Sequence, residues 1–140
     1  MRRKRPLKKK IYAVACAVLA VDLRHVARRL GMDVEFRFLE AGLHDRPNLL
    51  REKLQAAVDE INAAGDAARI VIGYGVCGRG AVGVKAGEVP MAIPRVHDCI
   101  ALFLGGDAAY RREFRKAPGT FYISAGWYEE KTEPISQRRR

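Results

Sequence analysis

The sequence contains few cysteines and no closely spaced pair of them. Only Cys16, Cys77 and Cys99 occur in 140 residues. Three cysteines cannot all pair within one chain, and small secreted domains held by disulfides usually contain more. No Cys-x-x-Cys pair is present, so local sequence alone does not impose a metal site. The cysteine content therefore indicates a reducing compartment, and we expect a cytoplasmic protein.

Long apolar runs are also missing. No run reaches the roughly 20 residues that a transmembrane helix requires, so we expect no membrane-spanning segment. The basic N-terminus followed by Ile11–Val21 resembles a signal peptide. However, Tyr12–Cys16 has the pattern of a buried strand, and an amphipathic helical period continues from Val18 to Leu30. We therefore interpret this stretch as the start of the fold.

The usual nucleotide-binding patterns are absent as well. A glycine-rich segment, Gly73–Gly83, has five glycines in eleven residues. It lacks the Gly-Lys-Ser/Thr of a phosphate loop, and its spacing does not fit the dinucleotide fingerprint. Its backbone N–H groups could hold an anion beside Cys77, or its glycines could serve tight turns. Its candidate ligand-binding residues are Gly75, Gly78, Arg79 and Gly80.

Positive charge is abundant but lies at the chain ends. The formal net charge is +10, with 26 Lys and Arg against 16 Asp and Glu. Ten of the 26 lie within residues 2–10 and 138–140, which leaves 16 against 16 in the body. We expect a basic tail at 1–9, a single domain at 10–128 and a polar, basic tail at 129–140. Such tails either are solvated or bind nucleic acid weakly through electrostatic attraction.

Apolar periodicity alternates between strand and helix patterns along the body. Strands are predicted at 10–16, 33–39, 69–74, 90–93 and 120–124, and helices at 18–30, 47–64, 97–104 and 107–116. This alternation predicts an α/β fold, a three-layer sandwich around a mainly parallel sheet of four or five strands. In such sheets, ligands bind at the carboxyl ends of the strands.

Several chemically reactive residues follow predicted strands and should meet at that edge. Thiolates and imidazole are good ligands for zinc, iron or an iron–sulfur cluster. The predicted metal ligands are Cys16, His44, Cys77 and Cys99. Further candidates for ligand binding at the same edge are Arg95, His97, Asp98 and Trp127. Because neighbours on a helix point in different directions, we do not expect His97 to act directly on Cys99.

Several blocks of the chain resemble a prokaryotic family numbered sixteen thirty-eight in the domain-of-unknown-function series. The blocks are Ile72-Gly-Tyr-Gly-Val-Cys-Gly-Arg-Gly80, Ile93-Pro-Arg-Val-His-Asp-Cys-Ile100, Leu104-Gly-Gly106 with Tyr110, Pro118-Gly-Thr-Phe-Tyr-Ile-Ser-Ala-Gly-Trp127 and, more weakly, Cys16 and Leu43–Pro47. The resemblance implies a setting in metal, corrinoid or methyl-group metabolism. Family members continue past the Gly-Trp block, so the resemblance also implies that a partner covers exposed surface here.

These observations lead to one main hypothesis and two alternatives. The main one is a metal-binding protein, either an enzyme or an accessory factor, with a cysteine-rich site and a small molecule or metal as its partner. The first alternative is a metal-independent cysteine enzyme with a glycine-rich anion-binding loop. The second is a basic module that binds nucleic acid. A homo-oligomer or a protein partner is compatible with each.

Overall fold

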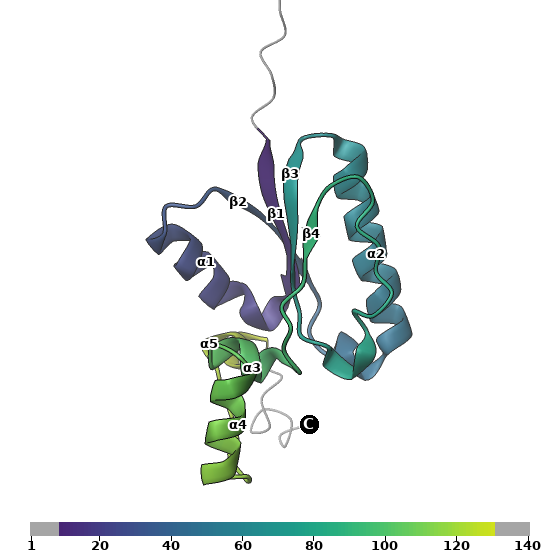
Figure 1. The fold of residues 1–140 in the computed structure, drawn as a ribbon. Coiled ribbons are helices and arrows are strands. Elements are labelled where there is room, and N and C mark those ends of the chain that lie inside the picture. The colour runs from purple at the N-terminus through teal and green to yellow at the C-terminus, as the bar shows by residue number, and fades with distance from the viewer. Residues whose placement is uncertain (1–8, 131–140) are drawn as a thin grey trace, which may run out of the picture.

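The computed structural model describes residues 9–130, without the side chain of Cys77. Its centre is a parallel sheet of four strands in the order β2-β1-β3-β4 (Figure 1). The strands are β1 (Lys10–Cys16), β2 (Val34–Leu39), β3 (Ala67–Gly73) and β4 (Met91–Ala92). The predicted α/β class and parallel sheet are confirmed.

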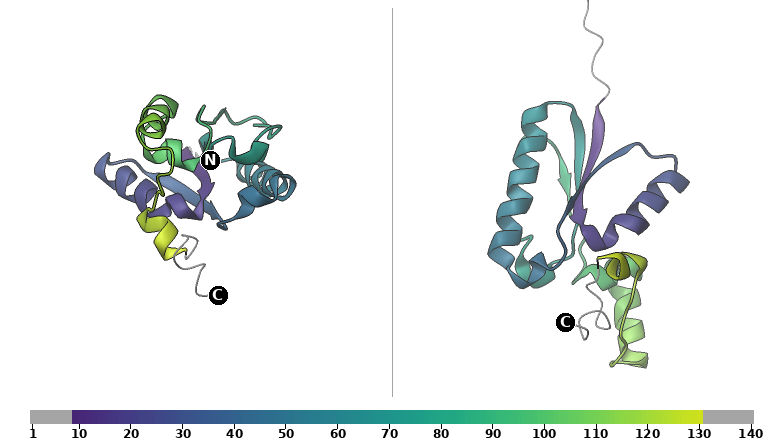
Figure 2. Two further views of the ribbon diagram at one scale, coloured as in Figure 1. Left: turned by 90° about the horizontal axis from the view of Figure 1, so that it is seen from below. Right: turned by 180° about the vertical axis from the view of Figure 1, so that it is seen from behind.

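Two helices cover opposite faces of the sheet, as Figures 1 and 2 show. Helix α1 (Ala20–Arg29) follows the short 3₁₀ helix η1 (Ala17–Leu19) and connects β1 to β2, and α2 (Pro47–Ala64) connects β2 to β3. The chain leaves β1 toward β2 on one side and leaves β3 toward β4 on the other, so the strand order reverses between β1 and β3. That reversal is where open α/β sheets form their ligand crevice.

Helix α2 and the sheet enclose the main core. The apolar side chains of α2 recur at helical spacing, and those of β1 and β3 alternate at strand spacing. The side chains with no exposed surface in this layer are Val14, Leu50, Leu54, Val58, Ile61, Ile70 and Ile72. The helix has the predicted bounds, with Pro47 in its first turn and Gly65 ending it at a φ of 73°.

The connection from β3 to β4 contains no α-helix. It includes the 3₁₀ helix η3 (Cys77–Arg79) and then runs along α2. Asn62 on α2 holds this segment, because its amide donates to the Ala86 carbonyl at 2.8 Å and its oxygen accepts from the N–H groups of Glu88 and Val89 at 3.0 and 2.9 Å. The amide also donates to Val58 within the helix. One side chain thereby replaces the packing that a crossover helix would supply.

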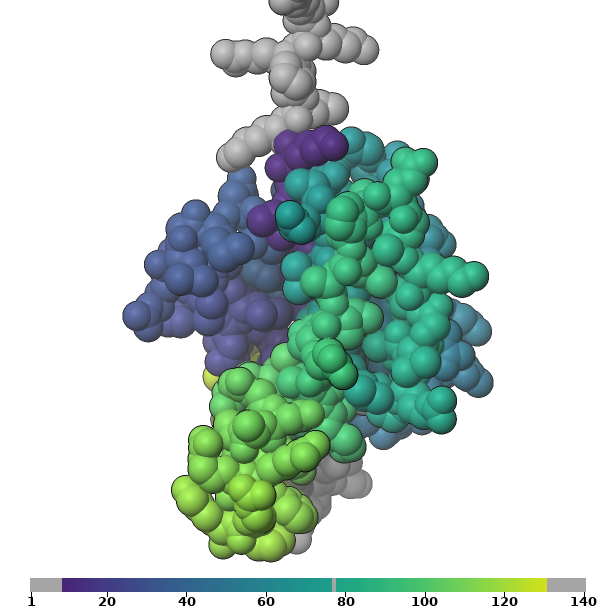
Figure 3. Space-filling model, viewed as in Figure 1, coloured from purple at the N-terminus to yellow at the C-terminus, as the bar shows by residue number. Residues whose placement is uncertain are grey.

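Within the described residues, three helices follow β4 at the carboxyl edge of the sheet. These are α3 (Cys99–Phe103), α4 (Asp107–Lys116) and α5 (Ala125–Glu129). Helix α4 projects away from the sheet (Figures 1 and 3) and has no buried residue. Helix α5 instead packs against η1 and α1.

The predicted fifth strand at Thr120–Ser124 is wrong. These residues are extended but join no sheet ladder among the described residues. Strand β4 is only two residues long and offers a short edge for pairing. The chain beyond Thr120 turns instead toward η1, where Ser124 caps α5 and Gly126 packs directly on the Val18 carbonyl.

Within residues 9–130, no helix combines the length and the apolar character needed to cross a membrane. The predicted basic tails lie almost wholly outside the described residues, which leave out 1–8 and 131–140.

Candidate metal and ligand site

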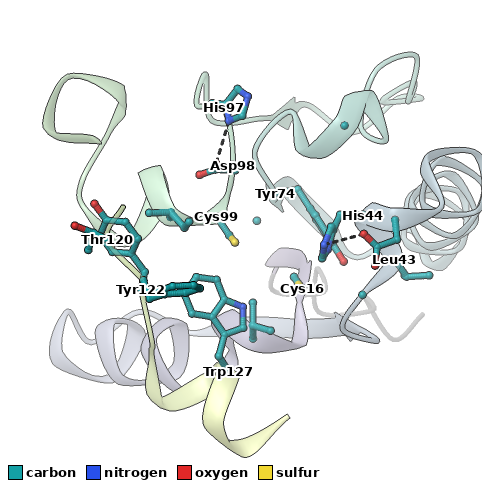
Figure 4. Close-up of a pocket in the computed structure, with 17 residues that line it drawn as sticks. Cys16, Leu43, His44, Tyr74, His97, Asp98, Cys99, Thr120, Tyr122 and Trp127 are labelled. Carbon is teal, nitrogen blue, oxygen red and sulfur yellow. Dashed lines mark hydrogen bonds and ion pairs between the residues drawn. The ribbon is translucent and has the colours of Figure 1, made fainter. Parts of the chain in front are cut away.

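A cavity of about 690 Å³ lies at the carboxyl ends of β1 and β3. Segments far apart in the sequence form it: the end of β1, the 3₁₀ helix η2 (Leu43–Asp45), the residues after β3 and β4, the extended stretch at 120–122, and α5. Figure 4 shows Cys16 and Cys99 in its middle, Tyr122 and Trp127 on one side, and His44 and Tyr74 on the other. The cavity therefore lies at the edge that the parallel topology predicts.

Two of the three cysteines contribute thiols to this cavity. Cys16 is the last residue of β1 and is buried, whereas Cys99 is the first residue of α3 and is half-buried. Asp98 fixes the start of α3 because its Oδ1 accepts the Ala101 N–H at 3.0 Å, as an N-cap does. Neither of these two cysteines forms a disulfide.

The backbone after β3 and the backbone after β4 lie side by side. The Val76 N–H donates to the Val96 carbonyl at 2.9 Å. One residue earlier, Gly75 packs on the backbone of Asp98, where an added Cβ would lie 2.7 Å from its N and Cα. This contact brings the Cys77 backbone next to the segment that leads into Cys99. The neighbouring Gly78 lines the cavity.

His44 enters the cavity from η2. Its Nε2 lies 3.2 Å from the Asp45 carboxylate, and its side chain is 60% exposed. The sequence predicted only a loop here, and the 3₁₀ turn is what places the imidazole at the cavity. Because η2 also contacts η3, His44 approaches the glycine-rich segment that contains Cys77.

His97 and Asp98 form a hydrogen-bonded pair at the rim. His97 Nδ1 lies 3.0 Å from Asp98 Oδ2, and the His97 backbone N–H donates to Asp107 Oδ1 at 3.0 Å. The His97 side chain is 77% exposed. In Figure 4 its ring lies beyond Asp98, apart from the Cys99 sulfur. The paired carboxylate leaves Nε2 as the nitrogen that faces solvent or a ligand.

The surroundings of Cys16 have opposing effects on the pKa of its thiol. Burial raises the pKa of the Cys16 thiol above its usual range, because a thiolate is poorly solvated there. A backbone hydrogen bond from Val18 and one from the Tyr74 hydroxyl act in the opposite direction but are smaller. The net shift is upward, so Cys16 is a protonated thiol at neutral pH unless a cation replaces the proton.

Aromatic rings form the wall opposite His44. Trp127 belongs to α5, whose first turn is fixed because Ser124 Oγ accepts the Trp127 N–H at 3.2 Å. Phe103 packs behind Trp127 with ring centroids 5.5 Å apart. Tyr122 and Phe121 reach the cavity from the extended stretch, although Phe121 is also 79% exposed.

The predicted site residues fall into two groups. Those that line the cavity are Cys16, His44, Gly78, His97, Asp98, Cys99 and Trp127. The others lie outside its lining: Gly75 and Gly80 are buried in packing contacts, Gly80 against Leu50, while Arg79 and Arg95 are exposed. The Cys77 side chain lies outside the described atoms. Among the described side chains, no three His, Cys, Asp or Glu residues are grouped closely enough to hold a metal.

Sequence reasoning missed Tyr74 and Tyr122 as cavity residues. Tyr74 lies between Gly73 and Gly75 in the glycine-rich segment. Its side chain is buried, as the alternation of buried residues along β3 predicts. Tyr122 was assigned to a strand, and no local signal showed that this stretch would return to the cavity. Only the packing of α5 on η1 determines that position.

Comparison with known families gives one match. Residues 38–140, well over half of the chain, match the family described as "Protein of unknown function (DUF1638)". No curated protein and no solved structure matches the chain.

Proposed function

Because the chain belongs to the DUF1638 family, whose description names no activity, we propose a function from the cavity itself: binding of a transition metal. The proposed ligands are Cys16, Cys77, Cys99 and His44. The observation that carries the proposal is that Cys16, Cys99 and His44, from three separate segments, line one cavity at the strand-order reversal. Sulfur and imidazole donors of this kind suit zinc, iron or an iron–sulfur cluster.

The donor set needs Cys77 to be complete. The described side chains alone do not make a group of three ligands. The hydrogen bond from Val76 to Val96 and the contact of Gly75 with Asp98 bring the backbone at 77 next to the chain entering Cys99. In this proposal Cys77 joins the donors of β1 and α3, and the loops carrying His44 and Cys99 close around the ion.

The metal would supply Lewis-acid chemistry if one position stays open, or an electron-transfer or structural centre if four protein ligands fill it. The first case makes the protein an enzyme and the second an accessory factor of metal or methyl-group metabolism. The protein's own contribution begins at Cys16. Because the pKa of the Cys16 thiol is raised, the sulfur is protonated in the metal-free protein, and metal binding there releases a proton. Metal affinity should therefore fall as the pH is lowered.

The test is metal analysis after anaerobic purification with a reductant. Wild-type protein should carry or take up one equivalent of metal, and cobalt(II) should give thiolate-to-metal charge-transfer absorption. The variants Cys16→Ser, Cys77→Ser and Cys99→Ser should each lose it. His25→Ala is the matched control, since His25 is an exposed residue of α1 outside the cavity lining. Absence of stoichiometric metal in wild type, or full binding by Cys77→Ser, contradicts the proposal.

A metal-independent nucleophile is the second candidate, and the burial of the thiols favours Cys99 over Cys16 for it. Cys99 is the more exposed of the two, whereas the pKa of Cys16 is raised. An activated thiolate reacts faster than an ordinary one near neutral pH. Rapid alkylation of Cys99 in metal-free protein would support this candidate, and slow alkylation of Cys99 and Cys77 alike would contradict it.

A further inference from the structure

The charged groups around the cavity are of one sign. The chain has 26 Lys and Arg, yet none of the described residues that line the cavity is basic apart from two histidines. The lining includes two carboxylates, those of Asp45 and Asp98. With neutral histidines, the described lining has a negative formal charge. Such a cavity attracts cations and disfavours phosphates or carboxylates.

The cavity is also much larger than one metal ion requires. Its volume of about 690 Å³ falls within the range typical of sites for small organic molecules. Of the proposed metal donors, Cys16, Cys99 and His44 occupy the middle and one side of Figure 4, while Tyr122 and Trp127 form the other side. Tyr122 and Trp127 are not among the proposed metal donors, so this half of the cavity has room for a further ligand.

Aromatic faces supply a specific attraction for positive charge. A cation within about 6 Å of a Trp or Tyr ring is held by the negative face of the ring, most strongly when both are shielded from water. The Trp127 ring packs on Phe103, and the Trp127 backbone N–H donates to Ser124 Oγ, which fixes the start of α5. Tyr122 lies beside it in the lining. The Trp127 side of this wall is therefore packed against the protein before any ligand arrives.

We propose that the aromatic half of this cavity binds a small organic cation of the alkylated ammonium type. The cationic nitrogen packs against Trp127 and Tyr122, and the Asp98 carboxylate contributes the long-range attraction. This inference takes the ligand-binding role of the cavity from the proposed function and names the class of ligand. Thiolates bound to a metal would add negative charge and strengthen the preference, but the aromatic wall and the carboxylates do not depend on the metal.

The same observations oppose the anion-binding role predicted for the glycine-rich segment. Gly75 and Gly80 pack against protein atoms, and Arg79 lies outside the lining. The close packing of Gly80 on Leu50, where an added Cβ would lie 2.5 Å from Cδ2, accounts for that glycine without a ligand.

The experiment compares choline with its uncharged isostere 3,3-dimethyl-1-butanol and with acetate. Binding is measured by titration calorimetry and by the fluorescence of Trp127, the single tryptophan of the chain. Choline should bind about threefold to thirtyfold more tightly than the isostere, the factor expected from the cation–π interaction. Acetate should not bind. Equal binding of choline and the isostere, or preferential binding of acetate, overturns the inference.

Variants test which residues hold the cation. Trp127→Leu should lower the affinity for choline by a similar factor while leaving the affinity for the isostere unchanged. Trp127→Phe should restore part of the lost choline affinity. Asp98→Asn should weaken choline while keeping the Oδ1 acceptor that caps α3. Phe114→Leu is the control, because Phe114 is an exposed aromatic residue of α4 outside this lining. Choline affinity unaffected by both Trp127→Leu and Asp98→Asn overturns the assignment.

Metal-free and metal-loaded protein are titrated separately to separate this inference from the proposed function. Selective choline binding without any metal uptake supports the organic-cation site and contradicts the metal proposal. Metal uptake through the cysteines without selective choline binding supports the metal proposal and contradicts the organic-cation site.

Discussion

Gly75 and Asp98 form a close backbone contact between the two loops that lead to Cys77 and Cys99. A Cβ on Gly75 would lie 2.7 Å from both the N and the Cα of Asp98, a separation that real Cβ atoms do not tolerate. Neither partner can yield by rotating a side chain, because the Asp98 atoms belong to the backbone. The contact therefore determines how far apart the two loops lie.

Gly75→Ala should move the Asp98 loop and destabilise the protein by about 1–3 kcal/mol, as overpacking of a dense site does. Urea unfolding measures the change. Gly119→Ala is the matched control, since an added Cβ at 119 meets nothing within 4 Å. Equal midpoints for the two variants would show that the loops are not packed as described. In Gly75→Ala we also expect weaker metal uptake, because both thiol-bearing loops shift.

Asn62→Ala should destabilise the connection between β3 and β4. The substitution removes three hydrogen bonds from the Asn62 side chain to residues 86–89. At a net contribution of about 1 kcal/mol each, the free energy of unfolding should fall by about 2–3 kcal/mol. Asn62→Asp keeps the acceptor oxygen but loses the donor, and its loss should be intermediate. Glu52→Ala, at an exposed position of the same helix, should have little effect.

Gly126→Ala should displace α5 from η1, because its new Cβ would collide with the Val18 carbonyl oxygen. Trp127 is the next residue and the only tryptophan, so its fluorescence reports this movement alone. We expect a shift of emission to longer wavelength as the indole becomes more exposed to water. Ala125→Gly, at an exposed position of the same helix, is the comparison. An unchanged emission spectrum in Gly126→Ala contradicts the described packing.

The stability of metal-free protein should fall in alkaline solution partly because of Cys16. The pKa of its thiol is raised in the folded protein, so the unfolded chain loses this proton first as the pH rises. The contribution of this thiol to the free energy of unfolding is fully present below about pH 8.5, the ordinary cysteine pKa. It decreases as the pH rises from there through the higher pKa of the folded state. In Cys16→Ala this contribution should disappear, which urea unfolding between pH 7.5 and 10 under reducing conditions will show. The pKa of Tyr12 is raised as well, but the ordinary tyrosine value is about 10, so Tyr12 lowers stability only from the upper end of this pH range onward. An identical slope in variant and wild type would contradict the assignment.

Local sequence predicted the elements whose determinants are local. Pro47 and Gly65 specify the two ends of α2, and apolar runs specify β1 and β3. The parallel topology then predicted the edge at which Cys16, His44 and Cys99 meet. Each of these inferences depends on spacing within one segment or on a rule about sheets.

The features that local sequence did not reveal depend on contacts between distant segments. Thr120–Ser124 has strand-forming residues, but the segment leads to Gly126, which packs directly on the Val18 carbonyl. This contact lies away from the free edge of β4. Gly75 and Gly80 were predicted to face a ligand, whereas they permit close packing on Asp98 and Leu50. A glycine needed for a ligand and a glycine needed for packing look the same in a sequence.

The placement of α5 has a consequence for the order of folding. The cavity includes residues from Cys16 to Trp127, and its last wall is completed when α5 reaches η1, more than a hundred residues earlier in the chain. The buried residues of the core between the sheet and α2 all precede the end of β4, whereas Leu102, Phe103 and Trp127 pack against that core from outside. During synthesis the thiol of Cys16 would therefore be accessible long before its aromatic cover arrives.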